Sequence, residues 1–160
     1  MTSLNQVCEC QCGKTELLIK GKPITRIACH CQICQEFNQA DFADITLFLS
    51  KDVMLSHDNT VDFKAYQSPP AVQRGKCVYC NNPAIERFDM PLCPSITMIP
   101  SNLIPPGSSL PSLSAHIFYH RKITDIHDSL PKISGFLKSQ LFVGKQIVTG
   151  IIKNKLSLSR

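Results

Sequence analysis

The sequence predicts a mainly β domain with few, short helices, and three observations lead to this prediction. Long helical periodicity is absent. Short runs rich in β-branched and aromatic residues are separated by Gly, Pro, Asn and Ser, as in strands joined by turns. The chain has six prolines from Pro91 to Pro111, which exclude a long helix there. Its 160 residues, 43% of them hydrophobic, are enough for one domain with a sizeable core.

The elements can be placed along the chain in order. The first clear strand, residues 15–20, ends where Gly21 and Pro23 interrupt the run. Further strand-like runs occupy residues 42–49, 61–66, 95–99 and 115–119, a short helix is expected at 32–39, and turns are expected at 68–70 and 129–132. From Phe136 the tail mixes apolar and basic residues, and the sequence leaves helix and strand open there.

The sequence shows no signal for export or for membrane insertion. No apolar run approaches the 18 or more residues that span a bilayer. Residues 1–7 lack the basic region and apolar stretch of a secretory signal. We therefore expect a cytoplasmic protein without a membrane partner. In that reducing compartment, closely spaced cysteines are metal ligands or catalytic groups more often than disulfides.

The net charge of +5 is unevenly distributed. The last acidic residue is Asp128, and the six basic residues after it have no compensating carboxylate. Such a tail can favour an anionic partner, although a solvated surface that aids solubility is the simpler interpretation. Nucleic-acid binding is not favoured, because the basic stretch lacks interleaved aromatic residues and the pI of 8.7 is low for that role.

Four of the nine cysteines are predicted to form a structural zinc site. They come in two pairs distant in sequence, Cys10 with Cys12 and Cys77 with Cys80. A structural zinc takes four such ligands in a tetrahedron, usually two from each of two turns. Cys8 offers a different register for the first pair, but Gly13 favours Cys10 and Cys12 because a glycine lets the backbone turn close to the metal. Metal binding at such a site contributes to folding, by about 10–16 kcal/mol in zinc-finger peptides.

A second cluster, Cys29, Cys31 and Cys34, offers three thiolates within six residues. Three protein ligands with an open fourth position are typical of a catalytic zinc. Three thiolates make such a zinc a weak activator of water, but it can hold an incoming thiol as a thiolate. The alternatives are a closed site completed by Cys93, His30 or His116, and oxidation of Cys31 with Cys34. Cys8 and Cys93 are expected to be ordinary thiols.

Over residues 7–136 the ordered set of motifs resembles the glutathione-dependent formaldehyde-activating enzyme family, also called the centromere protein V family. The motifs are Cys10-Gln11-Cys12-Gly13, Cys29-His30-Cys31-Gln32-Ile33-Cys34, Tyr66-Gln67-Ser68 leading to Arg74, Cys77-Val78-Tyr79-Cys80, His116-Ile117-Phe118-Tyr119 and Asp128-Ser129-Leu130-Pro131. The chain departs from the family at three positions. Gln35 stands where members commonly carry arginine, and Ala40 and Asn81 stand where glycine is common.

The resemblance implies a β-tent fold of small antiparallel sheets around a structural zinc held by Cys10, Cys12, Cys77 and Cys80. It implies a second zinc, catalytic or labile, at Cys29, Cys31 and Cys34. It also implies a carbon–sulfur lyase that handles glutathione and formaldehyde, in which the basic group of Arg74 can help to orient glutathione. Residues 1–137 would form this domain, and residues 138–160 would be a basic extension to which we can assign no role.

Five further polar residues are expected to have supporting roles. His30, between two cysteines, is expected beside the metal or at the surface rather than on it. His116 and His120 have even spacing along one predicted strand, so we expect them to share a face and to pack or bond the backbone, with a general-base role as the sharper alternative. Asp125 and Asp128 are expected to brace a turn.

The function predicted from the sequence is therefore that of a zinc-dependent carbon–sulfur lyase-like protein. Its partners would be a small thiol such as glutathione and an aldehyde adduct such as S-hydroxymethylglutathione. The alternative is a noncatalytic, zinc-stabilised β-tent interaction module, because a fold alone does not determine a function.

Overall fold

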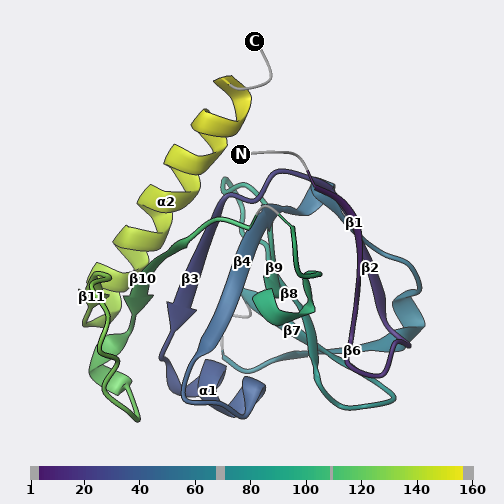
Figure 1. The fold of residues 1–160 in the computed structure, drawn as a ribbon, viewed down its shortest axis with the longest axis horizontal. Helices are drawn as coiled ribbons and strands as arrows, with labels where there is room; N and C mark the ends of the chain where they lie inside the picture. Colours follow the sequence, from purple (N-terminus) through teal and green to yellow (C-terminus); the bar gives the residue numbers. More distant parts are fainter. Residues whose placement is uncertain (1–3, 68–70, 109, 157–160) are drawn as a thin grey trace.

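The computed structural model describes residues 4–67, 71–108 and 110–156, which form two β-sheets and two α-helices (Figure 1). The smaller sheet has the order β1 (Leu4–Glu9), β2 (Glu16–Gly21), β5 (Val53–Leu55), and both of its strand pairs are antiparallel. It lies at one side of the molecule, and the larger sheet occupies the rest.

The larger sheet has eight strands within the described residues. Its order is β11 (Lys132–Ile133), β10 (Leu113–Ile117), β3 (Thr25–Cys29), β4 (Ala43–Leu49), β9 (Ile96–Pro100), β8 (Pro83–Phe88), β7 (Val72–Cys77), β6 (Val61–Ala65). Neighbouring strands are antiparallel except β10, which runs parallel to both β3 and β11. Four single turns of 3-10 helix join these elements, at Ser50–Asp52, Asp58–Thr60, Ser101–Leu103 and Tyr119–Arg121.

The mainly β class predicted from the sequence is confirmed. The runs at 15–20, 42–49, 61–66 and 95–99 correspond to β2, β4, β6 and β9. The predicted run at 115–119 lies two residues further along the chain than β10. The strand ends at Ile117 because Phe118 adopts a left-handed conformation with φ 53°. Residues 129–132 contain no strand before Lys132, as a turn requires, and the break expected at 68–70 lies outside the described residues.

Two hydrophobic clusters form the core. The first is built on alternate residues of β2, where Leu17 and Ile19 point inward against Phe48 and Ile99. The second lies over β3, β4 and β10, and it contains two of the predicted zinc ligands, Cys29 and Cys34. These cysteines are therefore held in the protein interior rather than on a loose loop.

Helix α1 (Gln32–Asn38) begins directly after β3, as predicted for residues 32–39. Cys31 is its N-cap, and the Cys31 sulfur accepts a hydrogen bond from the Cys34 N–H at 3.4 Å. The helix ends at Gln39, which has the left-handed conformation with φ 50°. The end of β3 and the start of α1 together bring Cys29, Cys31 and Cys34 close to one another.

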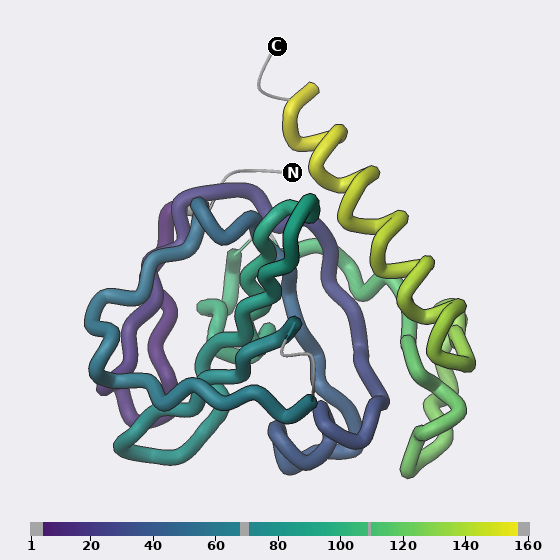
Figure 2. The backbone as a smooth tube through the Cα atoms, turned by 180° about the vertical axis from the view of Figure 1, so that it is seen from behind, coloured from purple at the N-terminus to yellow at the C-terminus, as the bar shows by residue number. Residues whose placement is uncertain are grey.

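Helix α2 (Phe136–Leu156) is the element that the sequence left open, and with 21 residues it is longer than the short helices expected. It packs beside β3 and β11 and extends past the sheets toward the C-terminus (Figures 1 and 2). Its inner face places Phe142, Val143, Ile147 and Ile151 on the second core cluster. No helix in the described part of the chain is long and apolar enough to cross a bilayer.

Candidate metal centres

Four cysteine sulfurs meet at the edge of the two sheets. Cys10 and Cys12 follow β1, Cys77 ends β7, and Cys80 lies in the turn to β8. The four sulfurs all lie within 4.8 Å of one another, with 3.4 Å from Cys10 to Cys12 and 3.7 Å from Cys12 to Cys77. A tetrahedral zinc with Zn–S bonds of about 2.3 Å requires sulfurs about 3.8 Å apart. The donor type, number and spacing therefore fit zinc.

Two tight turns aim these sulfurs inward. Gly13 has φ +72°, and its N–H donates to Cys10 O at 2.8 Å, which closes the first turn as the glycine argument predicted. Asn81 has φ 57° and donates to Cys77 O at 2.9 Å, so it replaces the family's common glycine in a left-handed turn. Cys8 is fully buried in the first core cluster, and the four grouped sulfurs include those of Cys10 and Cys12 but not that of Cys8.

The protein environment favours the thiolate form of Cys10 and Cys77, whose pKa values are lowered, whereas the pKa of Cys12 is raised by its cysteine neighbours. Burial raises the pKa of Cys77, but hydrogen bonds from Thr15 and from the backbone N–H groups of Cys80 and Tyr79 outweigh it and lower the pKa to about 6. The Thr15 N–H also donates to the Cys10 sulfur at 3.3 Å. Because a metal binds the thiolate rather than the thiol, these donors prepare the site for a divalent cation.

The second cluster has three sulfurs, those of Cys29, Cys31 and Cys34, which also lie within 4.8 Å of one another. Hydrogen bonds from Cys29 and Cys34 lower the pKa of Cys31 to about 3, while Cys34 itself has a raised pKa because it shares its proton with these neighbours. Cys29 and Cys34 are buried and Cys31 is half-buried, so an incoming group reaches the cluster from the side of Cys31.

The closed alternatives for this cluster do not form within the described residues. Cys93 is exposed in the loop between β8 and β9, and neither His30 nor His116 contributes a nitrogen to the group. Each of the nine cysteines is a free thiol. Three sulfurs without a fourth protein ligand among the described residues fit a zinc ion with one open position.

A buried ion pair lies next to the second cluster. Arg74 Nη2 is 3.9 Å from Cys34 Sγ, and Arg74 Nε is 2.7 Å from Glu86 Oε2. The Nε–H does not point at the carboxylate, so this contact is an ion pair rather than an aligned hydrogen bond. Burial raises the pKa of Glu86 to about 7, although Arg74 opposes the change. Glu86 thus holds the one predicted substrate-binding residue, Arg74, against the thiols.

His30 is fully buried and belongs to a chain of hydrogen bonds. Its Nε2 is 2.9 Å from His116 Nδ1, and His116 Nε2 is 2.8 Å from Asp128 Oδ2. Asp128 also accepts from Lys132 Nζ at 2.7 Å and from the Leu130 N–H at 3.1 Å, which confirms that it braces a turn. An ionised Asp128 accepts from His116, and His116 then accepts from His30. This chain fixes the turn between Cys29 and Cys31.

The expectation that His116 and His120 share a face is wrong. Because β10 ends at Ile117 and a 3-10 turn follows, His116 is buried whereas His120 is exposed. His120 Nδ1 accepts a hydrogen bond from the Gly135 N–H at 2.9 Å, which is the backbone bonding expected of it. Gln35 also has a backbone role, since its Nε2 donates to Arg121 O at 2.9 Å.

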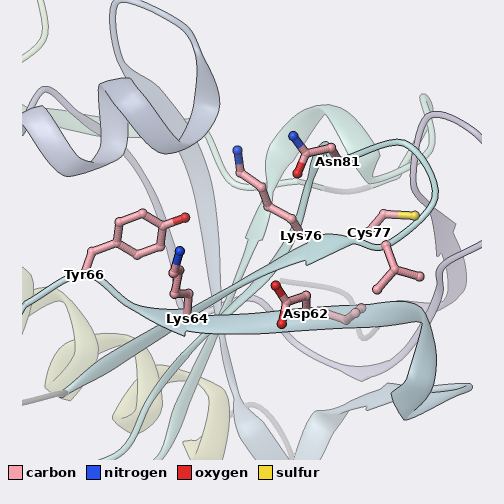
Figure 3. Close-up of a pocket in the computed structure, with 8 residues that line it drawn as sticks. Asp62, Lys64, Tyr66, Lys76, Cys77 and Asn81 are labelled. Carbon is pink, nitrogen blue, oxygen red and sulfur yellow. The ribbon is translucent and has the colours of Figure 1, made fainter.

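A pocket of about 530 Å³ opens on one face of the β6–β7 hairpin (Figure 3). Asp62, Lys64, Tyr66 and Lys76 line it. In this register Lys64 lies opposite Arg74 and Asp62 lies opposite Lys76, so three cations share the face. The Arg74 guanidinium, which contacts Cys34 of the second cluster, lies 6.0 Å from the centre of the Tyr66 ring, and the lining of the pocket also includes Cys77 of the first centre.

Comparison with known proteins agrees with this geometry. A family model described as "Glutathione-dependent formaldehyde-activating enzyme" matches residues 5–121, most of the chain. The chain belongs to this family. It is also similar to a crystal structure of a Rhodobacter sphaeroides protein, with a TM-score of 0.52 and 11% identity over 65% of this chain and 92% of that one, which supports the fold alone. No curated protein sequence matches.

For this member of the formaldehyde-activating family, sequence reasoning missed three site residues and one contact. Glu86, Lys64 and Lys76 were not singled out, and the contact between His30 and His116 was not expected. The alternation of charged residues at 62, 64, 74 and 76 was a usable signal, because residues two apart on paired strands share a face. The histidine contact joins residues 86 positions apart and had no local signal.

Proposed function

We propose that this family member is a zinc-dependent carbon–sulfur lyase-like enzyme of the cytoplasm. Its substrate would be a small anionic thiol, glutathione by default, together with formaldehyde or their adduct S-hydroxymethylglutathione. The observation that carries the proposal is the three-sulfur cluster with an open side, next to a buried arginine and a cationic pocket. We assign a structural zinc to Cys10, Cys12, Cys77 and Cys80 and a second, catalytic zinc to Cys29, Cys31 and Cys34.

A zinc held by three thiolates supplies one kind of chemistry, the stabilisation of an incoming thiol as its thiolate. The chain's own residues would do the rest. Arg74 is held in place by Glu86 and puts a fixed positive charge 3.9 Å from Cys34, where it stabilises negative charge on the substrate. In adduct formation the thiol sulfur bonds to the aldehyde carbon, the C=O π bond breaks, and the thiol proton ends on the oxygen.

The pocket matches the charges of glutathione. The peptide has two carboxylates and one ammonium group, and the pocket offers Lys64 and Lys76 as cations and Asp62 as an anion (Figure 3). Lys64 and Asp62 are exposed and Lys76 is half-buried, so all three remain accessible to a ligand. These side chains would orient the peptide while its thiol reaches the cluster past Tyr66 and Arg74.

The enzymatic proposal is tested by exchange NMR of glutathione and formaldehyde with zinc-loaded protein. We expect the exchange between free and adduct forms to be faster than without protein. The variant Cys31→Ser should lose this acceleration, and Cys93→Ser, which changes an exposed thiol outside the cluster, should keep it. A two-zinc protein that does not accelerate exchange would refute the enzymatic function.

The pocket is tested separately by Lys64→Gln and Lys76→Gln. Both changes remove a cation that would bind substrate equally in the ground and transition states, so KM should rise, by about tenfold for the pair, with little change in kcat. Lys20→Gln, at an exposed lysine on β2, is the matched control. An unchanged KM in the double variant would mean that glutathione does not occupy this pocket.

One observation favours the noncatalytic module. Two of the three sulfurs in the second cluster, those of Cys29 and Cys34, belong to the hydrophobic core. A metal at this position can be purely structural. Chelator titration discriminates, because a catalytic zinc with an open position should be removed before the four-cysteine zinc, whereas two structural zincs should leave together with unfolding.

A further inference from the structure

The outer face of α2 carries a row of exposed apolar side chains. We call Leu137, Leu141, Val148 and Ile152 the outer row. Their side chains are 68%, 66%, 57% and 51% exposed. The spacing of four, seven and four residues puts them on one side of the helix. Because Phe142, Val143, Ile147 and Ile151 already hold the opposite face on the core, the outer row has no part in packing this chain.

Lysines accompany the outer row. Lys138, Lys145 and Lys155 each lie three or four residues from one of its members, and all three are exposed. No carboxylate in the described part of the chain pairs with any of them. The sequence has no acidic residue after Asp128 to neutralise them. The face is therefore both apolar and positively charged.

This combination selects among partners. A second copy of the chain would bury the apolar row but would bring lysines against lysines, since α2 has no acidic residue. A nucleic acid would match the charge but would offer no apolar surface to the leucines. An anionic lipid surface satisfies both, because its headgroups attract lysine and its acyl boundary accepts Leu, Val and Ile.

We propose that the outer row of α2 is a docking surface for an anionic membrane, on which the helix lies in the plane of the interface. Figure 1 shows α2 along one side of the molecule, with its C-terminal part extending beyond the sheets, where a flat surface can reach it. The absence of a spanning segment argued against a membrane partner only for insertion across the bilayer; surface binding needs no such segment. The docking surface lies outside residues 5–121 and does not depend on the proposed enzymatic function.

The test is flotation of the full-length, zinc-loaded protein with vesicles of phosphatidylcholine alone and with vesicles containing about one-third phosphatidylserine. We expect binding to the anionic vesicles that weakens as salt is raised. Leu141→Gln with Val148→Gln should reduce the partition coefficient by more than tenfold. Lys138→Gln with Lys145→Gln should reduce it about 25-fold, since each lysine near an anionic surface is worth about fivefold.

The matched control is Met54→Gln, which replaces an apolar side chain with 56% exposure on β5, away from α2. It should leave vesicle binding unchanged, and the zinc content and thermal unfolding of all variants show that they are folded. Failure to float with anionic vesicles overturns the proposal, as does equal binding to neutral ones. A dimer in light scattering that the Leu141→Gln, Val148→Gln variant converts to monomer, without vesicle binding, would assign the surface to a second copy instead.

Discussion

Replacing Gly150 with alanine should reveal how closely α2 is seated on the sheet. Gly150 is buried where the helix crosses the start of β3. A Cβ atom at this position would lie 2.6 Å from the Ile24 carbonyl oxygen and 2.7 Å from Ile24 Cγ2. Real Cβ contacts are essentially never this short, and a backbone oxygen cannot rotate away as a side chain can. The helix must therefore shift to accept the methyl group.

Two opposing effects determine how much Gly150→Ala changes the free energy of unfolding. Alanine stabilises a helix interior by about 1 kcal/mol relative to glycine. Overpacking a close contact costs about 1–3 kcal/mol. The free energy of unfolding should therefore fall by as much as about 2 kcal/mol, which corresponds to a decrease of about 4–8 °C in Tm for a protein of this size.

The same helix provides the control. Gly144 is exposed, and an added Cβ there would meet no atom within 4 Å. Gly144→Ala should therefore raise the free energy of unfolding by up to about 1 kcal/mol. Both variants are compared with the parent by urea unfolding of zinc-loaded protein, followed by circular dichroism. If Gly150→Ala were as stabilising as Gly144→Ala, α2 would not be docked against β3, and our account of the second core cluster would be wrong.

Three more predictions concern the thiols and the buried histidine chain. Cys80→Ser should lower the zinc content by about one equivalent and destabilise the fold by several kcal/mol, and Cys93→Ser should do neither, as measured by metal analysis and thermal unfolding. A mild alkylating reagent should label the zinc-loaded protein once, at exposed Cys93, because the proposed zincs hold seven of the other thiols, exposed Cys12 among them, and Cys8 is buried with its pKa raised to about 11; a second rapid label would contradict this. A lysine and a buried histidine hold the pKa of Asp128 well below its usual range, so its contribution is present above about pH 4 and is lost as the pH falls below that value. Asp128→Ala should lower the Tm at neutral pH, more than Asp125→Ala does, and should flatten the acid limb of stability against pH; equal effects of the two changes would argue against the histidine chain.

The sequence predicted the elements that are determined by residues close together in the chain. The strands β2, β4 and β6 were visible as short strand-like runs, and the two cysteine clusters followed from spacing and from Gly13. The short helix after Cys31 was also expected. The strands, the short helix and each cysteine motif depend on residues close in sequence, and the joining of two distant cysteine pairs was inferred from the four ligands that zinc requires.

Contacts that depend on the pairing of strands distant in sequence could not be predicted from the sequence. The Arg74–Glu86 ion pair depends on β7 lying against β8, and the His30–His116 contact depends on the unusual parallel pairing of β3 with β10. Helix α2 was missed for a different reason. Apolar residues lie on both its inner and its outer face, so the sequence shows no single apolar stripe of helical period.

The sharing of one hydrophobic cluster by the three thiols and α2 has a consequence for how the molecule is divided. Cys29 and Cys34 belong to the same hydrophobic cluster against which Phe142 and Ile147 pack. A chain truncated before α2 would expose the cluster that holds Cys29 and Cys34, although the matched family region would be intact. The unit that unfolds cooperatively is thus larger than the matched family region, residues 5–121. Loss of α2 should therefore weaken metal binding by Cys29, Cys31 and Cys34.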